Sequence, residues 1–132
     1  MKKIMSANLA GKILLVAFIL MLVLHVLILL QVVPANIVWG GQINDEQSNL
    51  LQLEIVAITL TLIFSGIVAQ KLKFLNIGER KRVVNIGVWI VFAYLILNTL
   101  GNFASGVTAE TLLFGPLTIV MAFCALRLAL EK

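Results

Sequence analysis

Residues 33–54 read VPANIVWGGQINDEQSNLLQLE and form the longest break between the hydrophobic runs of the chain. The centre of this stretch is polar, with Asp45 and Glu46 and no Lys or Arg. The stretch then enters the next apolar run and ends on Glu54, a carboxylate among hydrocarbon side chains. In a chain that is otherwise mostly apolar, a polar loop that leads into a buried carboxylate is where we expect specific binding or chemistry.

The composition outside this loop indicates an integral membrane protein. Of the 132 residues, 61% are hydrophobic and 12% are charged, and the mean hydropathy is +1.10, whereas soluble domains are about 25% charged. Each apolar run supplies the roughly 20 residues that a helix needs to cross a hydrocarbon core of about 30 Å. We therefore predict an all-α fold, a single domain over residues 1–132 that forms an integral membrane four-helix bundle. Its transmembrane helices are expected at about residues 11–33, 49–70, 83–102 and 111–130.

The first of these runs is expected to stay in the protein as a span. It is too long for the apolar core of a signal peptide, and no small-residue cleavage site closes it. Helices are expected throughout because the bilayer core offers no water to satisfy backbone polar groups. A closed barrel would need short alternating strands, and the sequence has no such pattern.

Positive charge is confined to one side of this predicted topology. The basic residues fall at the two termini and in the loop between the second and third spans. Because cytoplasmic segments are enriched in Lys and Arg, we predict that both termini are cytoplasmic and that the loop with Trp39 faces outward. Topology thus accounts for the net charge of +4, and no nucleic acid partner is expected. The ten basic residues are Lys2, Lys3, Lys12, Lys71, Lys73, Arg80, Lys81, Arg82, Arg127 and Lys132.

The residues that best indicate function are those that are costly to place in a bilayer. Glu54 should lie ~8 Å inside the second span at 1.5 Å per residue, and an intramembrane carboxylate is a candidate functional group. His25 is expected in the outer half of the first span, at a similar depth, so the two can form a coupled acid and base. The alternative for both residues is a hydrogen bond that only ties helices or the outer loop together.

Two further groups complete the predicted binding site. Tyr94, Asn98 and Asn102 follow each other at four-residue spacing and share one helical stripe, where the amides either join helices or line a polar pocket. Trp39 and Gln42 belong to IVWGGQI (37–43), which can form a lid or an interfacial anchor. Because almost all buried polar positions are expected in the outer half, we predict a cavity open toward the outer leaflet. The predicted ligand-binding residues are His25, Trp39, Gln42, Glu54, Tyr94, Asn98 and Asn102.

Other chemistries have little support in the sequence. Cys124 is the only cysteine, so no internal disulfide can form. One His with scattered acids is too little for a metal site, and the chain has no phosphate-binding loop or nucleophile elbow. We predict no metal, no cofactor and no particular catalytic residue, and whether the protein is an enzyme stays open.

Two resemblances add to this interpretation. The run PANIVWGGQI (34–43), the carboxylate that follows it and the pattern GN…E…LFGPLT (101–118) resemble a group of small bacterial membrane proteins with four spans. This resemblance implies the fold and the bacterial inner membrane, but no activity. The layout of His25, Glu54 and Pro116 is similar to emopamil-binding and related sterol-isomerase-type proteins, whose pocket binds a hydrophobic amine or a sterol beside acids in the membrane. The second resemblance implies that Glu54 is a cation partner or proton donor supported by His25.

Three functions are compatible with these features. The first, which we expect, is the binding of an amphipathic small molecule or lipid in a polar pocket that faces the outer leaflet. The second is a small proton-coupled transporter that acts as a homodimer. The third is an accessory subunit whose polar residues only tie helices together and to a partner. Membrane lipids and a hydrophobic small molecule are the expected partners.

Overall fold

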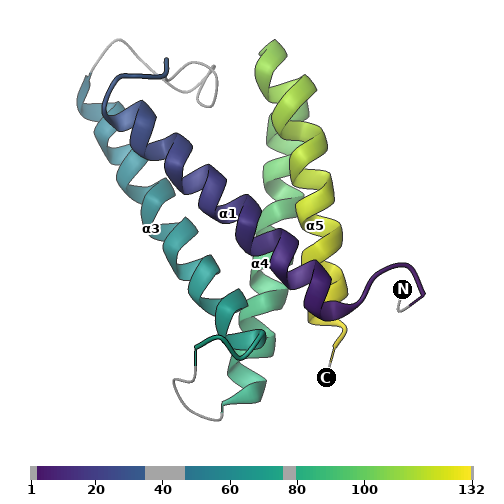
Figure 1. Ribbon diagram of the computed structural model, residues 1–132. Helices are drawn as coiled ribbons and strands as arrows, with labels where there is room; N and C mark the ends of the chain where they lie inside the picture. The colour runs from purple at the N-terminus through teal and green to yellow at the C-terminus, as the bar shows by residue number, and fades with distance from the viewer. Residues whose placement is uncertain (1–2, 35–46, 76–79, 132) are drawn as a thin grey trace.

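The structure is a computed structural model that describes residues 3–34, 47–75 and 80–131, with side chains from residue 50 onward in the second range. These residues form four long helices and no strand (Figure 1). Each of the four is long and apolar enough to cross a membrane, which confirms the prediction of an all-α fold with four such helices. They are α1 (Ala7–Leu29), α3 (Gln47–Lys71), α4 (Lys81–Ala104) and a fourth that combines the π-helical segment η1 (Glu110–Phe114) with α5 (Gly115–Ala129).

The helices follow one another around the bundle in the order α1, α3, α4, α5, and each packs against its two neighbours in this ring. Both ends of the chain lie at the same end of the bundle, which we call the terminal end (Figure 1). From there the α1–α3 pair and the α4–α5 pair diverge toward the opposite end, which we call the far end (Figure 1). The bundle is therefore closed at one end and splayed at the other.

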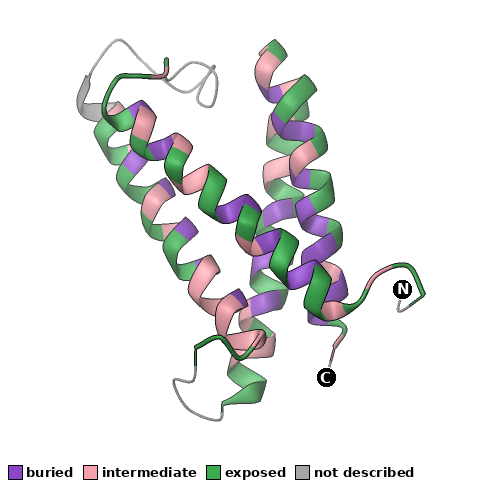
Figure 2. Cartoon of the chain, viewed as in Figure 1, coloured by how far each residue is buried: buried purple, intermediate pink, exposed green. Residues whose placement is uncertain are grey.

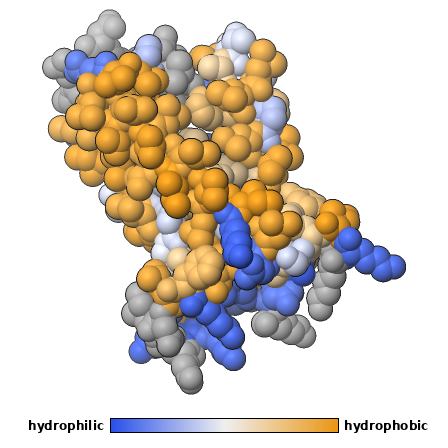
Figure 3. Space-filling view, viewed as in Figure 1, coloured by the Kyte–Doolittle hydropathy of each residue, from blue (hydrophilic) through white to orange (hydrophobic). Residues whose placement is uncertain are grey.

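The hydrophobic core fills the terminal half of the bundle. Small residues such as Ala10 and Ala125 are fully buried there and let the helix backbones approach each other, as in other membrane helix contacts. Most of the outer surface is apolar and exposed, with Leu20 and Leu97 as examples, which suits contact with lipid (Figures 2 and 3). The largest fully buried apolar side chains of the core are Leu14, Val68, Val88, Val91, Leu95, Cys124 and Leu128.

A polar cluster, which we call the terminal clasp, fastens the terminal end. Arg127 is buried, and its Nε donates to the Met5 carbonyl at 2.8 Å while its guanidinium pairs with Glu131 at 2.9 Å. Lys71 at the end of α3 donates to Asn85 of α4 at 2.9 Å and to the backbone carbonyl of Glu131. The clasp joins both chain ends to α3 and α4, and Figure 3 shows hydrophilic residues gathered at this end.

The first helix begins and ends earlier than the predicted range of 11–33. Its start is set by Ser6, whose hydroxyl accepts a hydrogen bond from the backbone N–H of Leu9 at 3.1 Å, a standard N-cap. The other helices begin and end within two residues of the predicted limits, which is the ordinary uncertainty of a helix boundary.

Two of the helices end in the same way, with a left-handed residue that is not glycine. Gln31 follows α1 with φ 61° and Lys73 follows α3 with φ 64°. At the α3 end, the N–H groups of Lys73 and Phe74 donate to the carbonyls of Gln70 and Ala69 at 3.0 and 2.9 Å. This pair of bonds is a Schellman motif, in which glycine is the favoured left-handed residue. A side chain at this position costs about 1–2 kcal/mol.

Lys73→Gly is therefore expected to stabilise the protein. Relief of the left-handed strain outweighs the added flexibility of the unfolded chain, for a net gain of about 0.5–1 kcal/mol in the free energy of unfolding. Lys12→Gly, at an exposed position inside α1, is the control and should lose about 1 kcal/mol. Thermal unfolding in detergent micelles measures both. If Lys73→Gly unfolds at a lower temperature than the wild-type protein, this account of the α3 end is wrong.

Candidate functional site

A buried pair of polar side chains joins α1 to α3 in the far half of the bundle. His25 Nδ1 lies 2.9 Å from Glu54 Oε2. His25 is 5% exposed and Glu54 is 0% exposed, so neither group can rely on water for its hydrogen bonds. The sequence predicted a similar depth for these two residues, and the structure brings them into direct contact.

The position of each partner follows from helical periodicity. His25 lies on the same stripe of α1 as Leu14, Phe18 and Ile28, all of which are buried. Glu54 precedes Ala57, Thr61 and Phe64 on the buried stripe of α3. The apolar neighbours of both residues pack the two helices together, and this packing presents the imidazole to the carboxylate.

The contact also defines the chemistry of the imidazole. When Nδ1 donates to the carboxylate, Nε2 is an acceptor in the neutral ring and a donor in the protonated ring. The pair thus couples the charge of Glu54 to the hydrogen-bonding character of His25.

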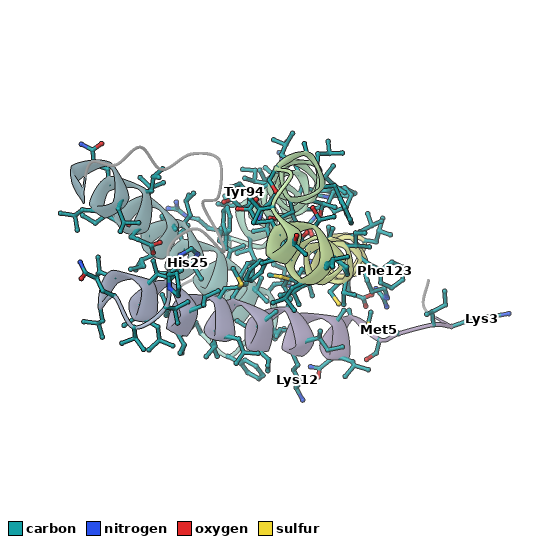
Figure 4. All side chains as sticks on the ribbon, turned by 90° about the horizontal axis from the view of Figure 1, so that it is seen from above. Lys3, Met5, Lys12, His25, Tyr94 and Phe123 are labelled. Atoms are coloured by element: carbon teal, nitrogen blue, oxygen red, sulfur yellow. The ribbon has the colours of Figure 1, made fainter. Side chains whose placement is uncertain are left out.

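A cavity of about 470 Å³ lies between the α1–α3 pair and the α4–α5 pair. His25, Tyr94, Asn98 and Asn102, four of the predicted site residues, line it. Glu54 lies behind His25 and is connected to the cavity by the 2.9 Å contact. Figure 4, which looks down on the bundle, shows His25 on α1 and Tyr94 across the bundle on α4. The apolar part of the lining consists of Phe18, Met21, Ala57, Leu60, Phe64, Leu95, Gly101, Ala104, Phe114 and Met121.

The predicted residues of α4 differ in what they contact. Asn98 faces the cavity, and within the described residues its side chain makes no hydrogen bond. Asn102 reaches Thr118 of α5 through a long contact of 3.5 Å between Nδ2 and Oγ1. The Tyr94 ring packs edge-on against Phe64 with centroids 5.0 Å apart. Asn98 is thus the amide of this stripe that is available to a ligand, while Tyr94 forms part of the cavity floor.

Four polar residues of the lining were not predicted to belong to the site, and Thr61 of α3 is one of them. Glu110 and Thr118 are 5% and 3% exposed and line the cavity from η1 and α5, and Ser105 lines it from the end of α4. The sequence contains only a weak indication that Glu110 belongs to the site. Glu110 lies eight residues before Thr118, and in an ideal α-helix this spacing would turn the two side chains toward different faces. The π-helical segment between them reduces that rotation.

The π-helical segment has a local cause in Pro116. A proline lacks the backbone N–H and collides with the carbonyl four residues earlier in an α-helix. The wider turn of η1 avoids this conflict, and the N–H of Gly115 donates to the Glu110 carbonyl, five residues back. The Thr118 hydroxyl lies 2.9 Å from the carbonyls of both Phe114 and Gly115, as potential acceptors.

Gly115 is also needed for packing in this region. A Cβ atom at this position would lie 2.8 Å from the Phe103 ring of α4, which is closer than side-chain carbons approach each other. Its absence lets the ring of Phe103 lie against the backbone where η1 meets α5. This contact fixes the segment that carries Glu110 against α4.

Two predicted site residues, Trp39 and Gln42, lie outside the described residues, and so does the predicted lid that contains them. Among the described residues, no group of three or more His, Cys, Asp or Glu side chains could hold a metal ion. The lining instead combines carboxylate, imidazole, amide and hydroxyl groups with aromatic and methionine side chains. Such a surface is suited to a molecule with one polar and one apolar part.

Removal of one member of the His25–Glu54 pair should cost more than removal of both. Glu54→Leu deletes the carboxylate beside Nδ1 and is expected to lower the free energy of unfolding by about 3 kcal/mol. His25→Leu combined with Glu54→Leu should recover most of this loss, because two apolar side chains can pack where a buried polar pair was. Thermal unfolding in detergent measures both variants.

Glu54→Gln is the intermediate case, since it keeps an oxygen acceptor and removes the charge. Its expected cost is about 1–2 kcal/mol, in the range of interhelical hydrogen bonds in membranes. A double leucine variant that is less stable than Glu54→Leu alone would contradict the pairing of these two residues.

The chain matches no protein-family model and no curated protein, and the fold matches no solved structure. The two resemblances noted in the sequence therefore stay predictions.

Proposed function

We propose that the protein binds an amphipathic small molecule or lipid in the cavity between its two helix pairs. The observation that carries this proposal is the Asn98 amide, which faces the cavity and has no hydrogen-bond partner among the described residues. An amide at membrane depth has a strong tendency to find a polar partner. A polar group of a bound molecule can supply that partner.

The size and lining of the cavity support the same proposal. Its volume lies in the range of about 300–1,000 Å³ that is usual for sites of small ligands. The polar group of the ligand would lie among His25, Asn98, Asn102 and Glu110, and its hydrocarbon part would pack on the aromatic and methionine side chains. Met21 and Met121 are well suited to this task because the flexible thioether adapts to ligands of irregular shape.

The terminal end is the cytoplasmic end in this proposal, and the membrane is the bacterial inner membrane. Most of the basic residues of the described chain gather at the terminal end (Figure 3), as the positive-inside rule requires of cytoplasmic segments. The cavity then opens in the half of the bundle that lies in the outer leaflet. A ligand from that leaflet would meet Asn98 without crossing the membrane.

The packing of the terminal half favours binding over transport. Leu14, Val68 and Val91 are fully buried between the cavity and the terminal clasp. A transported ion or polar molecule would have to pass through this layer of apolar side chains and then through the terminal clasp. The accessory-subunit alternative is less favoured because Asn98, which that alternative would use to tie helices, contacts the cavity instead.

Photo-crosslinking tests the proposal with a 16-carbon alcohol that carries a diazirine near its hydroxyl. In wild-type protein, we expect labelled peptides that contain residues of the cavity lining, and competition by the unlabelled alcohol. Asn98→Leu removes the amide and should weaken apparent affinity by about tenfold, the value of one buried hydrogen bond.

Thr99→Val is the matched control, because it removes a polar group from the neighbouring position of α4. Thr99 is not part of the cavity lining, and its hydroxyl donates to the Leu95 carbonyl within the helix. The affinity of this variant for the probe should be unchanged. The proposal fails if cavity peptides are not labelled in the wild-type protein, or if both variants bind the probe as the wild type does.

A further inference from the structure

The face of α4 that is turned toward α3 carries three residues at seven-residue intervals, Gly87, Tyr94 and Gly101. Seven residues are close to two helical turns, so the three positions share one side of the helix. The three positions lie at successive depths, from the terminal end to the far end. The surroundings of each one show how closely α3 approaches α4 at that depth. Each position has a different neighbour on α3.

The two helices are in close contact at the first position and have a ring between them at the second. A Cβ atom on Gly87 would lie 3.0 Å from the Ile67 side chain of α3. At the second position, the ring of Tyr94 fills the space and packs on Phe64 at 5.0 Å between centroids. Phe64 in turn contacts Phe18 of α1 at 6.1 Å. These three rings form the floor of the cavity.

The third position has no neighbour on α3. A Cβ atom on Gly101 would meet nothing within 4 Å among the described residues, although the residue lines the cavity. Gly101 is exposed, and so are Leu97 and Leu100 beside it on the outer surface of α4. In the part of the chain that the structure describes, the cavity therefore reaches the outside of the bundle between Leu60 of α3 and Gly101 of α4. We call this passage the α3–α4 opening.

The exposed side chains next to the opening on the outer surface of α4 are apolar. Gly101 lies within α4, one of the four helices that can cross a membrane, and its exposed neighbours Leu97 and Leu100 are 68% and 61% exposed. A molecule that passes through the opening thus moves between the cavity and the acyl chains of the bilayer. The absence of a side chain at position 101 leaves this edge of the opening unobstructed by α4.

We infer that the α3–α4 opening admits the hydrocarbon chain of a membrane amphiphile, so that the polar group lies in the cavity while the chain extends into the surrounding lipid. This inference depends on the proposed function and narrows its ligand to chain-bearing lipids. A compact hydrophobic molecule would not need an opening to the bilayer. The three aromatic rings of the floor prevent the chain from continuing toward the terminal end, so the side opening is its exit.

Gly101→Leu tests the inference, because the space at this position accepts a side chain that then lies in the opening. Two alcohols with a diazirine near the hydroxyl serve as probes, one with 16 carbons and one with four. Gly101→Leu should weaken cavity labelling by the 16-carbon probe by about tenfold and leave labelling by the four-carbon probe within about twofold.

Gly66→Leu is the matched control. A Cβ atom at Gly66 of α3 also meets nothing within 4 Å, and Gly66 is not part of the cavity lining. It should change labelling by neither probe. If Gly101→Leu weakens both probes equally or neither of them, the α3–α4 opening does not admit the chain.

A second measurement needs no variant. A 16-carbon alcohol with the diazirine at mid-chain should label Leu60 or Gly101 in the wild-type protein, and labelling confined to the cavity floor would overturn the inference. Failure of the proposed function gives a different result, since neither probe would then label the cavity of the wild-type protein.

Discussion

A polar side chain within a bilayer must find a polar partner inside the protein, and the contact between His25 and Glu54 is the main consequence of that rule in this fold. Both residues are buried, and their atoms are 2.9 Å apart. The contact fastens α1 to α3 in the far half of the bundle, where the helix pairs have already diverged (Figure 1). It is a direct polar contact between side chains of these two helices at that depth. Together with the apolar packing of α1 on α3, this contact holds the wall of the cavity on this side.

The same rule explains why the two halves of the bundle differ. In the terminal half, small residues and branched aliphatic side chains pack closely, and the terminal clasp satisfies Lys71 and Arg127. In the far half, the helix pairs diverge (Figure 1), and the π-helical turn before Pro116 carries Glu110 on the cavity face. Polar residues that would tie helices in a closed bundle face a shared cavity instead. The packed half holds the helices together, and in the proposed function the splayed half provides the surface for binding.

Much of the fold follows from the sequence, because length and hydrocarbon content specify where a membrane helix can lie. The depth of His25 and Glu54 was also predictable from their distance to the helix ends. Glu110 was missed because its place on the cavity face depends on a wide helical turn, which no periodicity of 3.6 residues describes. Gly101 was missed for a different reason: the sequence shows that a side chain is absent but not that the neighbouring helix is distant. Trp39 and Gln42 stay predictions, since they lie outside the described residues.

The most direct test of a binding cavity open to lipid is a high-resolution density map of the protein purified from its native membrane and kept in lipid nanodiscs. We predict continuous density with a polar end beside Asn98 and an elongated part that passes between Leu60 and Gly101. A closed contact between α3 and α4 at Gly101, together with Asn98 hydrogen-bonded to a neighbouring helix, would contradict the account. In that case the polar residues of the far half would serve only to hold the bundle together.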